Sequence, residues 1–429
     1  MKKGVLAAAI MAACMAFAAT AQAAAPGGPN CGVTELNIIA QRHLSLAHSE
    51  NYVKEFEEAN NVKVNITYLS ENDRRSRARL DASTGAGSYH IYYIDEANIA
   101  EFVNSGWVLP LLDYYPEEYD YNDFLEGNRD VASIDGVPYF CPLEGAPDAL
   151  FSRKDILDKL GLEPPETLEE FMAMLPKVHN PPEIYAATGR GQRGSGANVW
   201  RWTQFFRALG GEWLDADGKA AFNSEAGVKA SEMYKELLSY GPPGAFTYSW
   251  SDDLEAFRSG NAVFMLDTMS WADWMEDAEK SQVAGRVIYA KQPAPIVSAG
   301  WGHGLAIAAP ACKDDCTRSL AARYIAWVTS KEMEARRIKD GLPNTVFRKS
   351  SQSSQLFKDN MPPAVYEGMQ INSPGMYVQI MRSPVWPQIG DELGIALEQY
   401  YTGEIKTAKE ALDQAAEKAD RILRRAARQ

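Results

Sequence analysis

The chain has 429 residues, with 43 Lys and Arg residues against 57 Asp and Glu residues, for a formal net charge of −14. At roughly 150 residues per domain, this length predicts two or three domains. The 46% hydrophobic and 23% charged residues exclude a disordered chain, a collagen-like fibre and a small disulfide-stapled scaffold. The acidic balance argues against nucleic acid as the main partner, because a phosphate backbone requires a basic stripe.

The first 23 residues have the pattern of a signal peptide. Two lysines precede an apolar run at 5–19, and Ala21-Gln22-Ala23 supplies the small-x-small pattern of a cleavage site. The run is too short and too rich in Ala for a comfortable membrane span. We therefore expect residues 1–23 to be removed and the mature protein to be exported to the periplasm. A membrane anchor and lipid attachment at Cys14 are the competing interpretations.

Four cysteines remain after such a cleavage, namely Cys31, Cys141, Cys312 and Cys316. An even number of cysteines in an oxidising compartment predicts disulfides. Cys312 and Cys316 could close a small loop, which would leave Cys31 to pair with Cys141. Free thiols remain an alternative. A zinc site is disfavoured because no histidine lies near the second pair and the spacing fits no zinc pattern.

The N-terminal part alternates predicted strands and helices. Strands are expected at 35–40, 62–68 and 91–94, and a helix at 49–60, with another helix before the third strand. This βαβ order is typical of a parallel sheet covered on both faces. Ligands in such sheets meet the loops beyond the carboxyl ends of the strands. Here these loops carry Arg42, His43, Glu71, Asn72, Asp95 and Glu96.

The later part of the chain is more helical. Thr167-Leu168-Glu169-Glu170 has the spacing of a capping box and opens a predicted helix at 167–177. A strand at 184–188, a helix at 199–209 and a hairpin turn at 214–219 follow. The turn begins like a calcium loop but lacks the remaining ligands. A second capping-box pattern opens a helix at 407–425.

One glycine-rich segment could be mistaken for a dinucleotide-binding motif. Residues 189–194 match the glycine fingerprint of dinucleotide binding, and Glu212 stands about where the ribose-binding acid would be. The segment lies in mid-chain, however, and carries two arginines where small residues normally pack. The alternative is a flexible polar loop at a helix N-terminus, which can offer N–H groups and arginines to a ligand. We expect no cofactor.

Catalytic and metal patterns are weak. The sequence has no G-x-S-x-G elbow and no cysteine with a catalytic signature. Its five histidines make no zinc pattern, and the tyrosine pairs that could suggest ferric-ion ligation are more simply faces of strands or helices.

With these residues in view, the mature chain resembles the extracellular solute-binding proteins of sugar-type ABC importers, the maltose-binding-like family. The stretches that carry this resemblance follow the family's order along the chain and lie at 56–64, 106–111, 136–142, 151–155, 164–167, 257–265, 341–343 and 403–412. Gly106-Trp107-Val108-Leu109-Pro110-Leu111, for example, is similar to a "GW-x-x-PL" element of the family.

The resemblance implies an α/β fold of two lobes, each a mixed or parallel sheet flanked by helices, with the ligand cleft between them. Lobe 1 would comprise 32–142 with 301–345 returning to it, and lobe 2 would comprise 143–300 with 346–429. It further implies closure by a hinge, delivery to an ABC permease in the inner membrane, and a separate ATPase. The chain would then be a monomer without catalytic residues.

A sugar or sugar alcohol presents hydroxyls at its edge and apolar C–H faces, so its cleft requires carboxylates, amides, arginines and an aromatic platform. The resemblance places such groups at Asp95, Glu144 and Trp271. Trp301 is the strongest aromatic candidate, because its glycine neighbours suit close approach of a ligand. Less specific candidates, chosen by their place in loops, are His43, Glu71, Arg190, Trp200 and Arg382. The competing interpretation is core packing for each Trp and a solvated loop for each acid.

Three functions therefore remain in competition. The favoured one is a periplasmic binding protein for a sugar or sugar alcohol. The second is an exported carbohydrate hydrolase, which would need two carboxylates about 5–10 Å apart across the scissile bond. The third is a binding protein of the same fold for a cation such as ferric ion or a polyamine.

Overall fold

The computed structural model describes residues 27–116, 119–296, 301–371 and 382–428. The predicted signal peptide at 1–23 lies outside these ranges. None of the helices within them combines the length and the apolar character that crossing a bilayer requires.

The described residues form two main sheets, a small antiparallel sheet of two strands, β4 and β5, and the helices around them. The strands are β1 (Glu35–Ala40), β2 (Lys63–Tyr68), β3 (Ile91–Asp95), β4 (Ser133–Ile134), β5 (Val137–Pro138), β6 (Cys141–Glu144), β7 (Asp148–Arg153), β8 (Tyr185–Thr188), β9 (Ala262–Thr268), β10 (Val287–Ala290) and β11 (His303–Ile307). The helices are α1 (Leu44–Ser49), α2 (Val53–Asn60), α3 (Glu71–Thr84), α4 (Ile99–Asn104), α5 (Glu126–Val131), α6 (Lys154–Leu160), α7 (Leu168–Val178), α8 (Asn198–Ala208), α9 (Glu225–Ser239), α10 (Trp250–Arg258), α11 (Ala272–Met275), α12 (Asp315–Val328), α13 (Lys331–Lys339), α14 (Lys349–Ser353), α15 (Gln355–Asn360), α16 (Pro363–Ile371), α17 (Trp386–Thr402) and α18 (Ala408–Ala426).

The first sheet has the strand order β2-β1-β3-β11-β6. Strand β1 runs parallel to both β2 and β3, as the βαβ pattern predicts, whereas β11 is antiparallel to both β3 and β6. Successive side chains of a strand point to opposite faces. Accordingly, Ile38 packs into one apolar cluster and Ile39 into another, so both faces of the sheet are covered.

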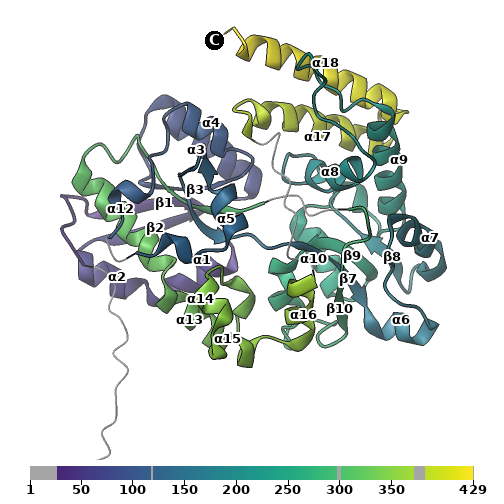
Figure 1. Cartoon of the computed structure of the whole chain (residues 1–429), viewed down its shortest axis with the longest axis horizontal. Coiled ribbons are helices and arrows are strands. Elements are labelled where there is room, and N and C mark those ends of the chain that lie inside the picture. Colours follow the sequence, from purple (N-terminus) through teal and green to yellow (C-terminus); the bar gives the residue numbers. More distant parts are fainter. Residues whose placement is uncertain (1–26, 117–118, 297–300, 372–381, 429) are drawn as a thin grey trace, which may run out of the picture.

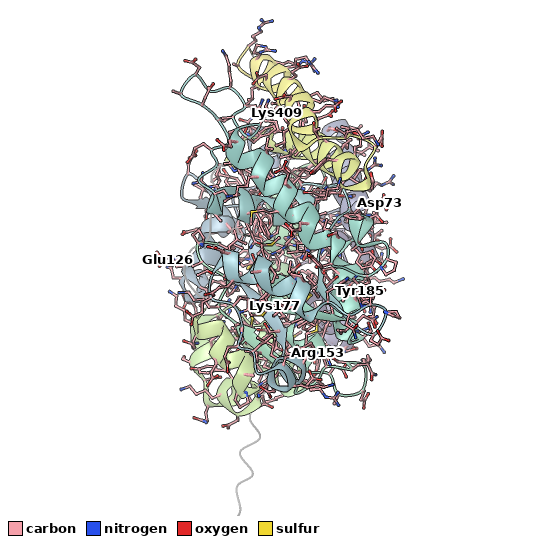
Figure 2. The ribbon with its side chains drawn as sticks, turned by 90° about the vertical axis from the view of Figure 1, so that its right-hand side faces the viewer. Asp73, Glu126, Arg153, Lys177, Tyr185 and Lys409 are labelled. Atoms are coloured by element: carbon pink, nitrogen blue, oxygen red, sulfur yellow. A yellow bond between two sulfur atoms is a disulfide. The ribbon has the colours of Figure 1, made fainter. Side chains whose placement is uncertain are left out.

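The second sheet has the order β10-β7-β9-β8. Only β8 and β9 are parallel among its pairs, and β7 is antiparallel to both of its neighbours. Helices α8, α9, α17 and α18 pack against one another beside this sheet, and they share one large apolar core. Figure 2 looks onto this side of the molecule, where Lys177 of α7 and Lys409 of α18 are labelled.

The chain crosses between the sheets more than once, which gives the molecule the expected two lobes (Figure 1). Strand β6 belongs to the first sheet and β7, which follows after three residues, belongs to the second. The chain returns from β10 to β11. It then crosses back, because α16 packs against β10 and α17 packs against α8.

Most predicted elements form close to their predicted bounds. Thr167 caps α7 with the complete capping box, in which Thr167 and Glu170 satisfy each other's backbone N–H groups. The main difference is the single helix expected at 49–60. It is divided into α1, a 3₁₀ turn at Glu50–Tyr52 and α2, so the helical segment starts five residues earlier.

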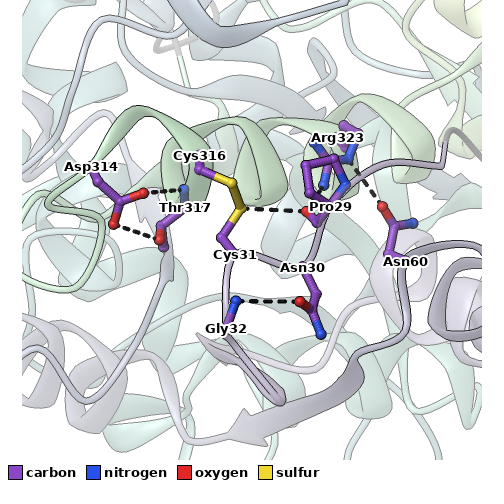
Figure 3. Close-up of a disulfide and its surroundings, with 9 residues drawn as sticks. All are labelled: Pro29, Asn30, Cys31, Gly32, Asn60, Asp314, Cys316, Thr317 and Arg323. Carbon is purple, nitrogen blue, oxygen red and sulfur yellow. Dashed lines mark hydrogen bonds between the residues drawn. A yellow bond between two sulfur atoms is a disulfide. The ribbon is translucent and has the colours of Figure 1, made fainter.

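The predicted cysteine pairing is wrong. Cys31 is bonded to Cys316, with their Cα atoms 5.6 Å apart (Figure 3). Cys141 and Cys312 are free and buried. Cys316 lies in the first turn of α12, beside the N-terminal segment. Cys312 precedes that helix, and its thiol instead lies 3.4 Å from the carbonyl oxygen of His90. Four residues of separation therefore do not bring the Cys312 and Cys316 side chains together.

The Cys31–Cys316 disulfide should contribute to stability because it closes a loop across 285 residues of sequence. We expect Cys316→Ser to lower the free energy of unfolding by about 2–4 kcal/mol, measured by urea denaturation. Dithiothreitol should lower the stability of the unmodified protein to a similar degree and leave the variant unchanged. An equal loss in both proteins would mean that the reductant acts elsewhere.

Candidate functional site

A cavity lies between the two lobes and occupies about 500 Å³, including space open to solvent. Its lining comes from the ends of β3, β6 and β9, from the start of β11 and the residues before it, from the loops after β1 and β8, from the 3₁₀ turn after β9, and from α3, α8 and α10. The lining residues are Gln41, His43, Glu71, Arg75, Glu96, Glu144, Arg190, Gly196, Trp200, Arg201, Trp250, Thr268, Trp271, Trp301 and His303. We call this space the inner cavity. Its position beyond the carboxyl ends of β1 and β3 is the one expected for a ligand of such a sheet.

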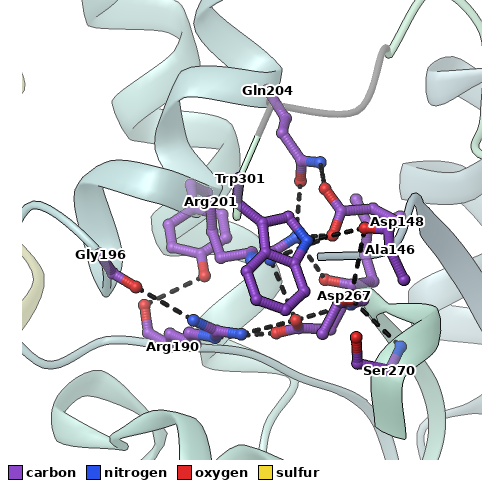
Figure 4. A network of polar contacts seen from close by, with 12 residues as sticks. Ala146, Asp148, Arg190, Gly196, Arg201, Gln204, Asp267, Ser270 and Trp301 are labelled. Atoms are coloured by element: carbon purple, nitrogen blue, oxygen red, sulfur yellow. Dashed lines mark hydrogen bonds and ion pairs between the residues drawn. The ribbon is translucent and has the colours of Figure 1, made fainter. Parts of the chain in front are cut away.

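A buried ionic network supports the second-lobe side of the cavity (Figure 4). Asp267, at the end of β9, accepts hydrogen bonds from Arg190 Nε at 2.8 Å and Arg190 Nη2 at 2.6 Å, and from Arg201 Nη2 at 3.0 Å. Arg201 also pairs with Asp148, to which the Gln204 amide donates a hydrogen bond of 2.8 Å. The bidentate contact fixes the plane of the Arg190 guanidinium group and places it at the cavity wall.

Arg75 of α3 joins the first lobe to the second. Its Nε donates to Asp95 at 2.9 Å and its Nη1 lies 2.7 Å from a Glu71 oxygen and 3.5 Å from the Ser195 hydroxyl across the cleft. Asp95 is also paired with Arg74. Burial alone would raise the pKa of Asp95, but Arg75 and Arg74 outweigh burial and hold this pKa below its usual range.

Histidine and glutamate side chains alternate along the first-lobe side. His43 Nδ1 lies 2.5 Å from Glu144, and His303 Nε2 lies 3.7 Å from Glu96. His303 Nδ1 is 3.2 Å from the hydroxyl of Tyr93. Burial lowers the pKa of His303 well below its usual value, so this imidazole is neutral at neutral pH. A neutral imidazole can both donate and accept a hydrogen bond.

Indole rings provide the apolar surface. Trp200, Trp271 and Trp301 are each at least 90% buried, and Trp250 is half-buried. The guanidinium carbon of Arg190 lies 4.9 Å from the centre of the Trp271 ring, in a cation–π contact. Trp301 Nε1 donates a hydrogen bond of 2.7 Å to the carbonyl of Ala146, so the ring is held in one orientation. Flat apolar surfaces of this kind suit the C–H faces of a carbohydrate.

The buried polar atoms at the cavity that have no hydrogen-bond partner among the described residues include Gln41 Oε1 and Arg75 Nη2. A buried polar atom without a partner costs about 1–3 kcal/mol. One is an acceptor and the other is a donor. A hydroxylated ligand in the inner cavity could satisfy both.

The structure brings together all but two of the candidates chosen from the sequence. The inner cavity is lined by His43, Glu71, Glu144, Arg190, Trp200, Trp271 and Trp301. Asp95 does not line it, because its carboxylate is taken by the arginines of α3, and the neighbouring Glu96 faces the cavity instead. Arg382 lies elsewhere and donates to the backbone carbonyls of Asp130 and Ser133. Whether the lining residues bind a ligand stays a prediction.

Several lining residues were not predicted, although most neighbour predicted ones. Gln41, Arg201 and His303 lie within two residues of His43, Trp200 and Trp301 respectively. Arg75 follows Glu71 by four residues on α3, so helical spacing could have identified it. No sequence pattern distinguishes Trp250 and Thr268 from ordinary core or surface residues.

The glycine-rich segment at 189–194 is explained by packing. A Cβ atom on Gly191 would lie 2.3 Å from the carbonyl oxygen of Phe246, so only glycine fits there. The segment places Arg190 at the inner cavity. Within the described ranges, no three His, Cys, Asp or Glu side chains are positioned to hold a metal ion.

The carboxyl group of Glu96 should make stability depend on pH. Burial, followed by the charge of Asp95, raises the pKa of Glu96 from 4.5 to about 8. Because the folded-state pKa is the higher one, this stabilising contribution is complete below pH 4.5 and is lost as the pH rises through about 8.

We therefore expect Glu96→Gln to melt at a higher temperature than the unmodified protein at pH 8–9, with the difference shrinking towards pH 5. Melting curves of the two proteins across this pH range test the expectation. A difference that does not change with pH would show that Glu96 does not titrate in this way.

Comparison with known proteins identifies relatives along nearly the whole chain. Residues 47–335 match the sequence model of the family described as bacterial extracellular solute-binding protein. The mannitol-binding protein of Pseudomonas aeruginosa PAO1 is 25% identical over 445 aligned positions, which cover 97% of each chain.

Solved structures agree with this comparison. An ABC transporter solute-binding protein of Agrobacterium vitis S4 with bound D-mannitol superposes with a TM-score of 0.82 at 25% identity, over 91% of this chain and 99% of that one. A solute-binding protein of Agrobacterium radiobacter K84 in complex with ribitol gives a TM-score of 0.82 at 26% identity, over 92% of this chain and 100% of that one.

Proposed function

This chain belongs to the family of bacterial extracellular solute-binding proteins, and we propose that it is the substrate-binding component of an ABC importer for a sugar or sugar alcohol. The ligand binds in the inner cavity between the lobes. Closure of the lobes around the ligand prepares it for release to a permease in the inner membrane, and a separate ATPase drives transport. The protein itself performs no catalysis.

The observation that carries this proposal is the combination of compensated charges with aromatic walls. Arg190 is neutralised by Asp267, and Arg75 by Asp95 and Glu71, so the site has no strong need for a charged ligand. A buried charge left unpaired would be costly, and here the protein pairs its own charges. The donors and acceptors that remain, together with the indole surfaces, match a neutral polyhydroxylated molecule.

The proposal assigns a role to each residue that was predicted from the sequence and lines the inner cavity. Glu71, Glu144, His43 and Arg190 hydrogen-bond to hydroxyls, and Trp200, Trp271 and Trp301 contact C–H faces. The acceptor Gln41 and the donor Arg75 are added from the structure. Asp95 acts indirectly, by orienting Arg75.

Hinge closure involves the segments that connect the sheets. The β6–β7 connection and the segment before β11 lie together, because Trp301 donates to the Ala146 carbonyl. Since Trp301 also lines the inner cavity, a ligand would contact the hinge directly. A ligand shifts the equilibrium between open and closed lobes only to the extent that it binds the closed state more tightly than the open one.

We also propose that residues 1–23 are a signal peptide and that the mature protein acts in the periplasm as a monomer. The signal peptide and the periplasmic location are supported by the basic and apolar pattern of the N-terminus and by the extracellular character of the family. The monomeric state is what the resemblance to maltose-binding-like proteins implies.

A thermal-shift panel tests the function. The secreted protein is melted with D-mannitol, D-glucitol, ribitol, D-glucose, maltose, L-glutamate, spermidine, CaCl₂ or FeCl₃, and every hit is titrated by calorimetry. A ligand that binds only the folded state raises the melting temperature. We expect a rise with one or more sugars or polyols and a stoichiometry of one. A rise only with a cation or glutamate would overturn the proposal, and release of glucose from maltose would support the hydrolase instead.

A further inference from the structure

A third carboxyl group, that of Asp253, lies beside the ionic network that Asp148 and Asp267 form with two arginines. Asp253 is on α10, a helix that packs against β8 and β9, and it is completely buried. Neither of its carboxyl oxygens has a hydrogen-bond partner among the described residues. Asp253 therefore lacks the contacts that stabilise the carboxylates of Asp148 and Asp267.

The network has fewer guanidinium groups than carboxyl groups. Asp267 accepts two hydrogen bonds from Arg190. Arg201 is shared between Asp267 and Asp148 (Figure 4). These two arginines balance two carboxylates, so an ionised Asp253 would add a buried negative charge without a partner. A buried group in this position changes its pKa and becomes neutral, because an isolated buried charge is far more costly. The contacts therefore favour a protonated Asp253.

A proton on Asp253 has an acceptor close by. Thr188 is the last residue of β8, and its hydroxyl faces the Asp253 carboxyl group. This hydroxyl is also buried and has no hydrogen-bond partner among the described residues. A protonated carboxyl group has one O–H donor, and a hydroxyl oxygen can accept it. One proton would thus satisfy two buried polar groups at once.

The surroundings of Asp253 act in the same direction. Burial, followed by the negative charge of Asp267, raises the pKa of Asp253 from 3.8 to about 8, and the two arginines offset this only in part. The other titratable groups that face Asp253 are Tyr234 of α9 and Tyr248, which precedes α10. Burial raises the pKa of both tyrosines, so neither brings a charge at neutral pH.

Asp253 is connected to two residues that line the inner cavity. Its helix begins at Trp250, and Arg190 follows Thr188 by two residues. A neutral Asp253 leaves the Arg190 guanidinium group to Asp267. An ionised Asp253 would attract the same guanidinium group and weaken its bidentate contact. The protonation state of Asp253 can therefore change how Arg190 is presented to a ligand.

We propose that Asp253 is a positioning residue that carries one proton at neutral pH, which balances the buried network and leaves Arg190 oriented by Asp267 at the inner cavity. Loss of this proton at alkaline pH weakens ligand binding. The effect on the ligand rests on the proposed function, whereas the proton on Asp253 can be measured without a ligand.

Urea denaturation of the full secreted protein between pH 5 and pH 7 counts the proton. An aspartate that is protonated in the folded state and ionised in the unfolded state releases one proton on unfolding. The unfolding equilibrium constant then rises about tenfold per pH unit through this group. We expect Asp253→Asn to remove this contribution, so that the logarithm of the constant rises by about one less per pH unit than in the unmodified protein.

Asp217→Asn is the matched control, because Asp217 is exposed in the turn at 214–219. It should leave the pH dependence of unfolding unchanged. An equal pH dependence in Asp253→Asn and the unmodified protein would overturn the proposal. Because Asn resembles the neutral form of Asp, failure of Asp253→Asn to fold at pH 7 would also count against a neutral Asp253.

Carbon-13 NMR of protein labelled at the aspartate carboxyl carbons locates the proton. The signal that is missing from Asp253→Asn belongs to Asp253. At pH 7 we expect this signal at the position of a protonated carboxyl group, and we expect it to move to that of a carboxylate as the pH rises to about 9. A carboxylate signal at pH 7 would show that Asp253 is ionised and would overturn the proposal.

Calorimetry with D-mannitol and with ribitol tests the positioning role. Glu96 titrates in the same range, so the comparison is made between Glu96→Gln and the double variant that also carries Asp253→Asn. We expect the affinity of Glu96→Gln to fall about tenfold from pH 7 to pH 9, and that of the double variant to change little with pH. Equal losses in the two proteins would overturn the positioning role.

The outcomes separate this proposal from the proposed function. If the unmodified protein binds no sugar or polyol of the thermal-shift panel, the proposed function and the positioning role are both wrong. The unfolding and NMR measurements still decide in that case whether Asp253 carries the proton.

Discussion

Replacing Asp267 with Asn is expected to lower the free energy of unfolding by about 3–5 kcal/mol. Asp267 is completely buried and neutralises Arg190 while sharing Arg201 with Asp148. Removing its charge leaves the Arg190 guanidinium buried without its bidentate carboxylate. The loss of a buried partner costs this much because the other charge can be neither solvated nor compensated. Urea denaturation measures the change.

Asp158→Asn is the matched control for this substitution. Asp158 is paired with Lys154 on the exposed surface of α6, at 2.5 Å, and exposed pairs contribute little. The control should therefore unfold at nearly the same urea concentration as the unmodified protein. If the two substitutions had equal effects, the network around Asp267 would not support the second lobe in the way described.

Arg75→Ala is expected to weaken binding of the sugar or polyol by about 2–3 kcal/mol, which is a factor of roughly 30–150. Asp95 and Glu71 fix two nitrogens of Arg75, and the third, Nη2, is buried at the inner cavity without a partner among the described residues. A hydrogen bond from this charged donor to a ligand hydroxyl would be lost. Arg75→Lys should restore little, because an ammonium group cannot contact Asp95, Glu71 and the ligand in the same planar arrangement.

Arg77→Ala provides the control for Arg75, since Arg77 lies on the same helix and is exposed. Its affinity for the ligand, measured by calorimetry, should equal that of the unmodified protein. Melting curves without ligand should be recorded for every variant, because Arg75 also holds the buried Asp95. Unchanged affinity in a folded Arg75→Ala protein would remove Arg75 from the proposed site.

Much of the fold could be predicted because its strands and helices carry local patterns. The strand at 35–40 alternates buried side chains between two faces of the sheet, and it forms with the predicted bounds. The capping box at Thr167 fixes the start of α7 within one residue. These features depend on neighbours in sequence, so the sequence contains them.

The features that could not be predicted depend on distant contacts. The bond between Cys31 and Cys316 requires the N-terminal segment to lie against α12, which no local pattern shows. At the end of β3, the ion pairs of Asp95 with the arginines of α3 hold this carboxylate away from the inner cavity, and Glu96 lines the cavity instead. The sequence could place an acidic pair at this loop without identifying the one at the cavity.

The remaining site residues show the same limit. Trp301 was predicted from its glycine neighbours and lines the inner cavity. Arg382 was chosen by its position in a loop, and its guanidinium group contacts carbonyls of 130 and 133 instead. The other four candidates chosen by loop position do line the inner cavity, whereas Asp95, at the carboxyl end of β3, does not. Neither criterion therefore identifies the lining residues by itself.

A crystal structure of the secreted protein grown with the sugar or polyol that gives the largest thermal shift tests the central claim most directly. The account predicts one ligand molecule in the inner cavity, with a hydroxyl within hydrogen-bond distance of Arg75 Nη2 and a C–H face against Trp271 or Trp301. Ligand density at any other place, with the inner cavity free of it, would contradict the account.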